Sequence, residues 1–268
     1  MPGETMPRCV GVRVTVADLD RSAAFYTDLL GFERVTATAE EIELGMGEMR
    51  LALRRAAPQA LRVMPPDSRA NDRWFRHLAI VVRDMAAASE RLQTYGVELI
   101  SREPQTLPDW NPASDGIEAL YFRDPDGHPL ELIRYPPDKG KAVWRESNEE
   151  LFLGVDHSAI VVADTAASLA FYRDKIGLSV VGEVYNFGAE QAALSGLSEA
   201  CVQVTSLLGR GTFGLELIEY VAPRGGRPMP ADTGVDDLWW AETLIELDNP
   251  EGERRLIRDP DGHTGEIR

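Results

Sequence analysis

Histidine and glutamate occur at matching places in repeated segments of this chain. Residues 57–83 align without a gap with residues 222–248, and this alignment puts Glu242 opposite His77. Imidazole and carboxylate groups both bind divalent first-row metals, and both transfer protons. The repeated positions are therefore the first candidates for a site with metal or acid–base chemistry.

A second repeated segment carries another pair of carboxylates. Residues 123–132 and 258–267 share the sequence RDPDGH and put Glu131 opposite Glu266. A chain that duplicates units of this size builds its fold by pairing the copies. Function is then expected where a copy holds residues capable of chemistry.

Four strand-like stretches rich in β-branched residues begin the repeated units. They cover residues 10–18, 76–84, 155–164 and 241–248. The first three are followed by helical stretches, for which the predicted N-caps are Asp18 or Asp20, Asp84, and Asp164 or Thr165. Further strands follow, with a tight Asp-Gly turn inside the DPDGH motif. The pattern predicts an α+β fold of tandem β-α-β-β-β modules.

The modules group into two predicted domains. A polar, proline-led stretch separates them, as expected of a linker. The N-terminal domain covers 8–136 with modules 8–56 and 73–136; the linker covers 137–151; and the C-terminal domain covers 152–268 with modules 152–221 and 238–268.

The fourth module is predicted to be abridged. Arg83 is followed by the next RDPDGH motif after 40 residues, whereas the equivalent Asp248 is followed by it after 10. A helix and one strand are therefore expected to be missing, with a turn at 249–253 in their place. The shortened module leaves a sheet edge or face that a homodimer can cover.

Charge and composition restrict the partners. The chain has 268 residues and a net charge of −16, which disfavours nucleic acids and anionic membranes. Its two cysteines, Cys9 and Cys201, are far apart and form no CxxC pair, which suits a reducing compartment. No stretch resembles a membrane span or a signal peptide, so we expect a cytoplasmic protein acting on a small molecule.

Two motifs give the chain a family resemblance. The pattern FY-x-D-x-x-G at 25–31 returns as FY-x-D-x-x-G at 171–177, and two modules end in DPDGH-x-x-E. With paired β-α-β-β-β modules, these motifs resemble the vicinal oxygen chelate superfamily, which includes glyoxalase I, epimerases, extradiol dioxygenases and drug-resistance proteins. The resemblance implies that two modules form a cup, in which the first and last strands of each module hold a divalent metal.

The resemblance places four candidate ligands in the C-terminal half. All four carry side chains that coordinate metals: His157, Glu216, Glu242 and Glu266. One imidazole with three carboxylates suits Fe²⁺, Mn²⁺, Ni²⁺ or Zn²⁺, and the negative charge favours the harder ions among them.

The N-terminal half is the weaker candidate. Only His77 and Glu131 occupy its ligand positions with coordinating groups, because Gly11 and Leu51 take the other two. The metal site is therefore expected in the C-terminal domain.

Three functions are open to such a chain. The first is a metal-dependent isomerase or lyase of the glyoxalase or epimerase type, in which the metal stabilises an enolate and Glu216 or Glu242 moves the proton. The second is an extradiol ring-cleaving dioxygenase, although Glu242 stands where its second histidine is expected.

The third candidate function is a metal-free protein that binds or sequesters a small molecule. Aromatic side chains would then matter more than the carboxylates: Trp110, Trp144, Tyr185, Phe187 and Trp239. The long stretch 104–116 is a candidate lid or specificity loop. His128 and His263 follow the tight turns of DPDGH, and a structural or solvent-exposed role is expected for both.

Overall fold

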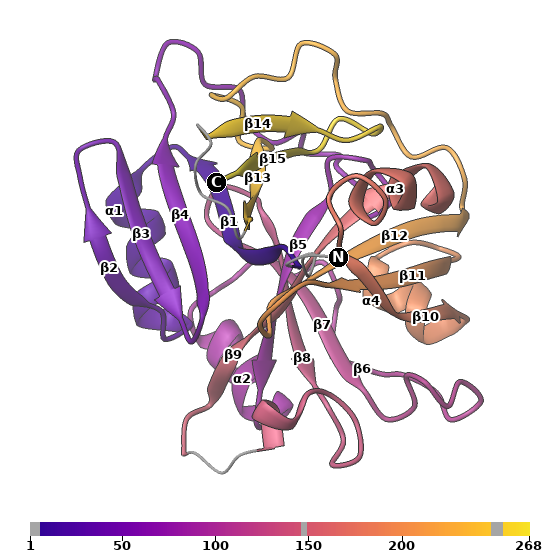
Figure 1. The fold of residues 1–268 in the computed structure, drawn as a ribbon. Coiled ribbons are helices and arrows are strands. Elements are labelled where there is room, and N and C mark those ends of the chain that lie inside the picture. Colours follow the sequence, from indigo (N-terminus) through magenta and orange to yellow (C-terminus); the bar gives the residue numbers. More distant parts are fainter. Residues whose placement is uncertain (1–5, 146–148, 248–253) are drawn as a thin grey trace.

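The molecule consists of two curved β-sheets with a few helices packed around them (Figure 1). The structure is a computed structural model, and it describes residues 6–145, 149–247 and 254–268. Within these residues the sequence forms four consecutive modules.

The first two modules each contain four strands and a helix. The first comprises β1 (Arg8–Val16), α1 (Leu19–Ala24), the π-helical turn η1 (Phe25–Leu29), β2 (Glu33–Ala37), β3 (Glu41–Met46) and β4 (Met49–Arg55). The second comprises β5 (Arg76–Val82), α2 (Met85–Thr94), β6 (Gln105–Thr106), β7 (Glu118–Arg123) and β8 (Pro129–Arg134).

The third module carries an extra helix and the fourth is short. After the 3₁₀ turn η2 (Ala142–Arg145), the third module comprises β9 (Phe152–Val162), α3 (Thr165–Tyr172), β10 (Ser179–Phe187), α4 (Ala189–Ser195), β11 (Cys201–Leu208) and β12 (Gly214–Ala222). The fourth comprises β13 (Ala241–Glu246), β14 (Arg255–Arg258) and β15 (Thr264–Ile267).

The abridged fourth module is confirmed. It has three strands where the others have four, and its described residues include no helix. The turn expected at 249–253 lies outside the described residues.

The modules pair across the two predicted domains. The first module joins the fourth in a seven-stranded sheet of order β14-β15-β13-β1-β4-β3-β2. The second joins the third in an eight-stranded sheet of order β10-β11-β12-β9-β5-β8-β7-β6. In Figure 1 the yellow strands of the chain's end accordingly lie beside the indigo strands of its beginning. We had expected pairing within 8–136 and within 152–268; the sheets instead follow the antiparallel pairs β1–β13 and β5–β9.

Tyrosine–aspartate hydrogen bonds connect the modules that are consecutive in sequence. Tyr26 follows α1 and donates to Asp124 in the first DPDGH turn at 3.0 Å. Tyr172 at the end of α3 donates to Asp259 in the second such turn at 3.1 Å. The FY and DPDGH motifs therefore act together, and each bond joins a helix of one module to a turn of the next.

Local sequence explains the first strands and the helix starts. All seven residues of β5 are buried, as expected for a strand at the centre of a sheet with both faces covered. The predicted caps Asp18, Asp84 and Asp164 each accept a hydrogen bond from a backbone N–H three residues further on. No helix in the described parts of the chain has the length and apolar character needed to cross a membrane.

Candidate metal centre

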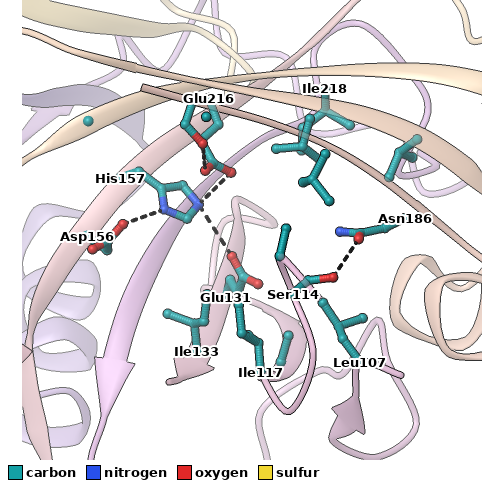
Figure 2. Close-up of a pocket in the computed structure, with 18 of the residues that line it drawn as sticks. Leu107, Ser114, Ile117, Glu131, Ile133, Asp156, His157, Asn186, Glu216 and Ile218 are labelled. Atoms are coloured by element: carbon teal, nitrogen blue, oxygen red, sulfur yellow. Dashed lines mark hydrogen bonds and ion pairs between the residues drawn. The ribbon is translucent and has the colours of Figure 1, made fainter. Parts of the chain in front are cut away.

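Four strands of the larger sheet bring two histidines and two glutamates into one cup. His77 is on β5, Glu131 on β8, His157 on β9 and Glu216 on β12. These strands are neighbours in the order β12-β9-β5-β8, so their inward side chains converge. Figure 2 shows His157 between the two carboxylates.

The distances suit a shared divalent ion. His77 Nε2 lies 3.0 Å from Glu131 Oε2, and His157 Nε2 lies 3.7 Å from Glu131 Oε2 and 3.2 Å from Glu216 Oε2. Ligand atoms of His77, Glu131 and His157 all lie within 4.8 Å of one another. Bonds of about 2.0–2.2 Å to one ion place adjacent ligand atoms about 3 Å apart, close to what is seen here.

The protonation of the cup also fits a metal. His77 is 1% exposed, and neither of its ring nitrogens makes a hydrogen bond to the described residues. Burial alone would lower the pKa of His157, but Glu216, Asp156 and Glu131 outweigh it and raise that pKa to about 9. Without an ion, a proton on His157 balances the nearby carboxylates, and a divalent ion bound at the same place would supply that positive charge instead.

Asp156 fixes the orientation of His157. Its Oδ2 lies 3.0 Å from His157 Nδ1, which leaves Nε2 directed at the two glutamates. A carboxylate behind a metal-binding imidazole sets the tautomer and raises its basicity. The arrangement directs the lone pair of Nε2 toward the centre of the cup.

A β-bulge places Asp156 and His157 together. Ala79 of β5 pairs with His157 and Ile80 pairs with Val155, so Asp156 is the extra residue of β9. A bulge re-aims side chains that would otherwise alternate between the faces of the sheet. Adjacent residues of one strand can therefore both reach the site.

The segment between the second and third modules contributes to the site. Lys141 Nζ lies 2.8 Å from Asp156 Oδ1, and Trp144 Nε1 donates to the same oxygen at 2.5 Å. Both residues lie in the predicted linker 137–151. These contacts hold Asp156 from behind while its other oxygen faces His157.

A cavity of about 440 Å³ opens from the cluster. It is bordered by the four candidate ligands, by the inward faces of β11 and β12, and by α4. On its far side, Asn111 and Ser114 hydrogen-bond to Asn186 Oδ1 at 2.8 and 3.0 Å. Figure 2 shows the bond from Ser114. The candidate lid 104–116 is thus attached to β10 across the cavity.

Glu242 and Glu266 lie elsewhere, so the prediction that they join His157 and Glu216 is wrong. They belong to β13 and β15 of the other sheet, where Arg13 Nη1 contacts Glu242 at 2.5 Å and Glu266 at 3.0 Å. Trp240 Nε1 also donates to Glu242 at 2.9 Å. A buried guanidinium therefore neutralises these carboxylates, and Glu242 has no access to the candidate metal centre as a base.

The two weaker candidates, His77 and Glu131, lie beside His157 and Glu216 where Glu242 and Glu266 had been expected. His77 and Glu131 occupy in the larger sheet the positions that Glu242 and Glu266 occupy in the smaller one.

The strand register of the smaller sheet corrects one aligned position of the first module. Ala52 pairs with Arg13 as Glu216 pairs with Ala159, so Ala52 rather than Leu51 matches Glu216. Neither Ala52 nor Gly11 can bind a metal.

The remaining histidines have structural contacts. His128 Nδ1 lies 2.7 Å from Asp124 Oδ2, and His263 Nε2 lies 2.8 Å from the carbonyl oxygen of Val161. Both are buried, which leaves the structural role and excludes the solvent-exposed one. The chain has four histidines, so the candidate metal centre holds the other two.

Sequence reasoning missed two residues that decide the arrangement. Arg13 is a cation within the apolar strand β1, which in hindsight signals a buried carboxylate partner. Asp156 precedes His157 directly, and strict alternation along a strand would place it on the opposite face. Only the bulge in β9 brings it to the site.

Comparison with known proteins agrees with the fold and the modules. The model of the Glyoxalase/Bleomycin resistance protein/Dioxygenase superfamily matches residues 8–132 and 154–243. The chain belongs to this superfamily. Its members share the vicinal oxygen chelate fold of curved sheets built from repeated modules.

Relatives within the superfamily have different activities. A 2-epi-5-epi-valiolone epimerase from an Actinomyces species is 33% identical over 161 residues, covering 51% of this chain and 85% of the relative. A lactoylglutathione lyase of Arabidopsis thaliana is 24% identical over 265 residues, covering 96% and 84%. A catechol-2,3-dioxygenase of Bacillus subtilis is 24% identical over 207 residues, covering 66% and 67%.

A solved structure agrees over nearly the whole chain. Glyoxalase I from Zea mays superposes with a TM-score of 0.63 at 17% identity, covering 97% of this chain and 92% of that one. The agreement concerns the fold, and the relatives do not single out one reaction.

Proposed function

We propose that this protein is a divalent-metal-dependent isomerase or lyase that moves a proton on the carbon next to a carbonyl group. The observation that carries the proposal is the cluster of His77, Glu131, His157 and Glu216 at the wall of a cavity. Two imidazoles with two carboxylates suit Fe²⁺, Mn²⁺, Ni²⁺ or Zn²⁺. When bound, such an ion supplies Lewis-acid stabilisation of a substrate oxyanion.

Glu216 is the proposed base. Its side chain is 20% exposed, against 7% for Glu131, and it borders the cavity. Ser206 Oγ donates to Glu216 Oε1 at 2.6 Å and holds this oxygen, so Oε2 is the atom that takes the proton. His77 and Glu131 are more enclosed and serve to hold the metal. A positioned carboxylate contributes about 10²–10⁴-fold to such a proton transfer.

Extradiol ring cleavage is the second candidate. His77, His157 and Glu131 provide the two-histidine, one-carboxylate set typical of non-haem Fe²⁺ oxygenases. His77 therefore supplies the second histidine that a dioxygenase needs. Two features still favour proton transfer: Glu216 adds a carboxylate beside the three residues that would hold the metal, and the two other histidines are engaged in turns.

Metal content and isotope exchange test the proposal together. We expect about one divalent ion per wild-type chain, loss of it in His77→Ala and Glu131→Gln, and retention in the matched control Glu242→Gln. The metal-loaded protein is expected to exchange the hydroxymethylene protons of hydroxyacetone with D₂O, followed by NMR. Glu216→Gln is expected to slow this exchange about 100-fold or more.

Three outcomes would contradict the proposal. A chain that binds no metal supports the metal-free binding protein instead. Oxygen consumption with catechol, without proton exchange, supports the dioxygenase. Metal loss in Glu242→Gln equal to that in Glu131→Gln would place the metal in the other sheet.

A further inference from the structure

The cavity beside the candidate metal centre has an apolar wall that metal binding does not require. Alternate residues of β11 and β12 face it, so that Ser206 is followed inward by Val204 and Val202, and Glu216 by Ile218 and Tyr220. Along both strands the lining side chains are polar beside the metal centre and mostly apolar away from it. Leu194 of α4, the helix that the first module lacks, continues this wall.

The charges around the cavity are almost all negative. Glu131, Asp156, Glu183 and Glu216 line it, and Lys141 is the one lysine or arginine among the described lining residues. Lys141 is already engaged, because its Nζ lies 2.8 Å from Asp156 Oδ1 and 3.0 Å from the Asp156 carbonyl oxygen. A divalent ion would balance Glu131 and Glu216 and leave no positive charge for a second anion.

We propose that this cavity takes an uncharged ligand, with its neighbouring oxygens at the metal centre and an apolar body against Val204, Ile218 and Leu194. The inference rests on the proposed function and specifies its substrate class. A carboxylate or phosphate at the apolar end would lose its hydration without gaining a counter-charge, which is costly. The volume of about 440 Å³ is in the range of ordinary small-molecule sites.

This substrate class would separate the protein from its lactoylglutathione lyase relatives. A peptide conjugate with free carboxylates needs lysine or arginine at the far end of the cavity, and the described lining residues offer none there. The polar groups at that end are neutral: Gln191 and Tyr220 both hydrogen-bond to Ser195. They suit a hydroxyl or an ether oxygen better than an acid.

A matched pair of probes tests the proposal on the full chain. The neutral probe is hydroxymethyl phenyl ketone, and the charged probe is the same molecule with a para-carboxylate. By calorimetry on the metal-loaded protein, we expect the neutral probe to bind at least about tenfold more tightly. Equal or tighter binding of the carboxylate, or no binding of either probe, would overturn the proposal.

Variants at one position locate the binding. Val204→Phe fills the apolar part of the cavity and is expected to weaken binding of the neutral probe at least about tenfold at unchanged metal content. Val180→Phe on the exposed face of β10 is the matched control and should leave both probes unaffected. Val204→Lys supplies the missing cation and is expected to shift the preference toward the carboxylate.

Failure of the substrate class and failure of the proposed function can be told apart. Metal content is measured on the same samples. A chain without metal contradicts the proposed function, while the preference between the two probes still tests the apolar part of the cavity. A chain with metal that prefers the carboxylate contradicts the substrate class alone.

Discussion

Asp156 orients the candidate metal ligand His157 without being a candidate ligand itself. It contacts His157 Nδ1 and is itself held by Lys141 and Trp144. We expect Asp156→Asn to weaken metal binding about 10–100-fold, because the imidazole loses its charged partner while its geometry is kept. Competition with a chelating dye measures this affinity. Asp174→Asn, an exposed ion-pair partner of Arg173, is the control, and equal affinities in the two variants would refute the role.

Arg13 takes the place of a metal in the smaller sheet. Its side chain is 7% exposed and contacts Glu41, Glu242 and Glu266. Removing one partner of a buried ion pair costs about 3–5 kcal/mol, so Arg13→Met should lower the free energy of unfolding by about that amount. Urea denaturation measures it. Adding Glu242→Gln should recover part of the loss, and no recovery would show that the carboxylates do not repel one another.

The two DPDGH histidines predict opposite pH dependences. Burial alone would lower the pKa of His128, but Asp124 outweighs it and raises that pKa above its ordinary value. Burial lowers the pKa of His263, whose neutral ring donates to the carbonyl of Val161. The stabilisation from His128 is therefore complete below about pH 6.5 and is lost as the pH rises, whereas that from His263 is complete above about pH 6.5 and is lost as the pH falls.

Urea midpoints across pH compare these histidines directly. The stability difference between wild type and His128→Gln should shrink with rising pH, and that between wild type and His263→Gln should shrink with falling pH. Parallel profiles for the two variants would contradict the assigned charge states.

The sequence identified the ligand types at this scale better than their grouping. Repeat alignment singled out His77, Glu131, His157 and Glu216, each by its place in a module. It then joined His157 to the wrong carboxylates, because spacing along the chain carries no information on which modules pair. The sequence did contain a signal for the correct pairing. The second and third modules each hold a histidine and a glutamate at the ligand positions, whereas the first holds neither.

At the scale of elements, the loop around Asn111 and strand β10 form one unit. Asn186 Oδ1 accepts hydrogen bonds from Asn111 and Ser114, and the rings of Trp110 and Phe187 stack with centroids 4.1 Å apart. Loss of two such bonds costs about 1–3 kcal/mol. Asn186→Ala should therefore raise the hydrogen exchange of residues 107–117 about tenfold or more without changing metal content.

Mass spectrometry follows this exchange peptide by peptide. Tyr185→Phe is the control, because its hydroxyl bonds Gln203 rather than the loop. Faster exchange at 107–117 in this control as well would show that the loop responds to any change in β10.

Elements were more predictable from the sequence than their assembly. The caps Asp18, Asp84 and Asp164 and the strand-like first segments were identified because both depend on near neighbours. The extra helix α4 was not expected. Its seven residues follow Gly188 in a connection that spans only a turn in the first module, and no periodic apolar pattern announces so short a helix.

At the scale of the whole molecule, the pairing of modules is nested. Every strand of the larger sheet lies between residues 76 and 222, whereas the smaller sheet joins Arg13 to Glu242 across 229 residues. The two sheets are tied by the Tyr26–Asp124 and Tyr172–Asp259 bonds, each of which links consecutive modules. The fold is thus one inner pair enclosed in sequence by one outer pair.

This nesting sets an order of assembly during synthesis. The inner pair is complete once β12 has left the ribosome, so the candidate metal centre can form while the fourth module is still being made. The first module is synthesised earliest, but β1 cannot pair with β13 until the fourth module has been made. This pairing closes a very long loop, which costs conformational entropy. A nascent chain arrested once residue 222 has emerged from the ribosome should therefore already bind metal, with its oldest strand still unpaired.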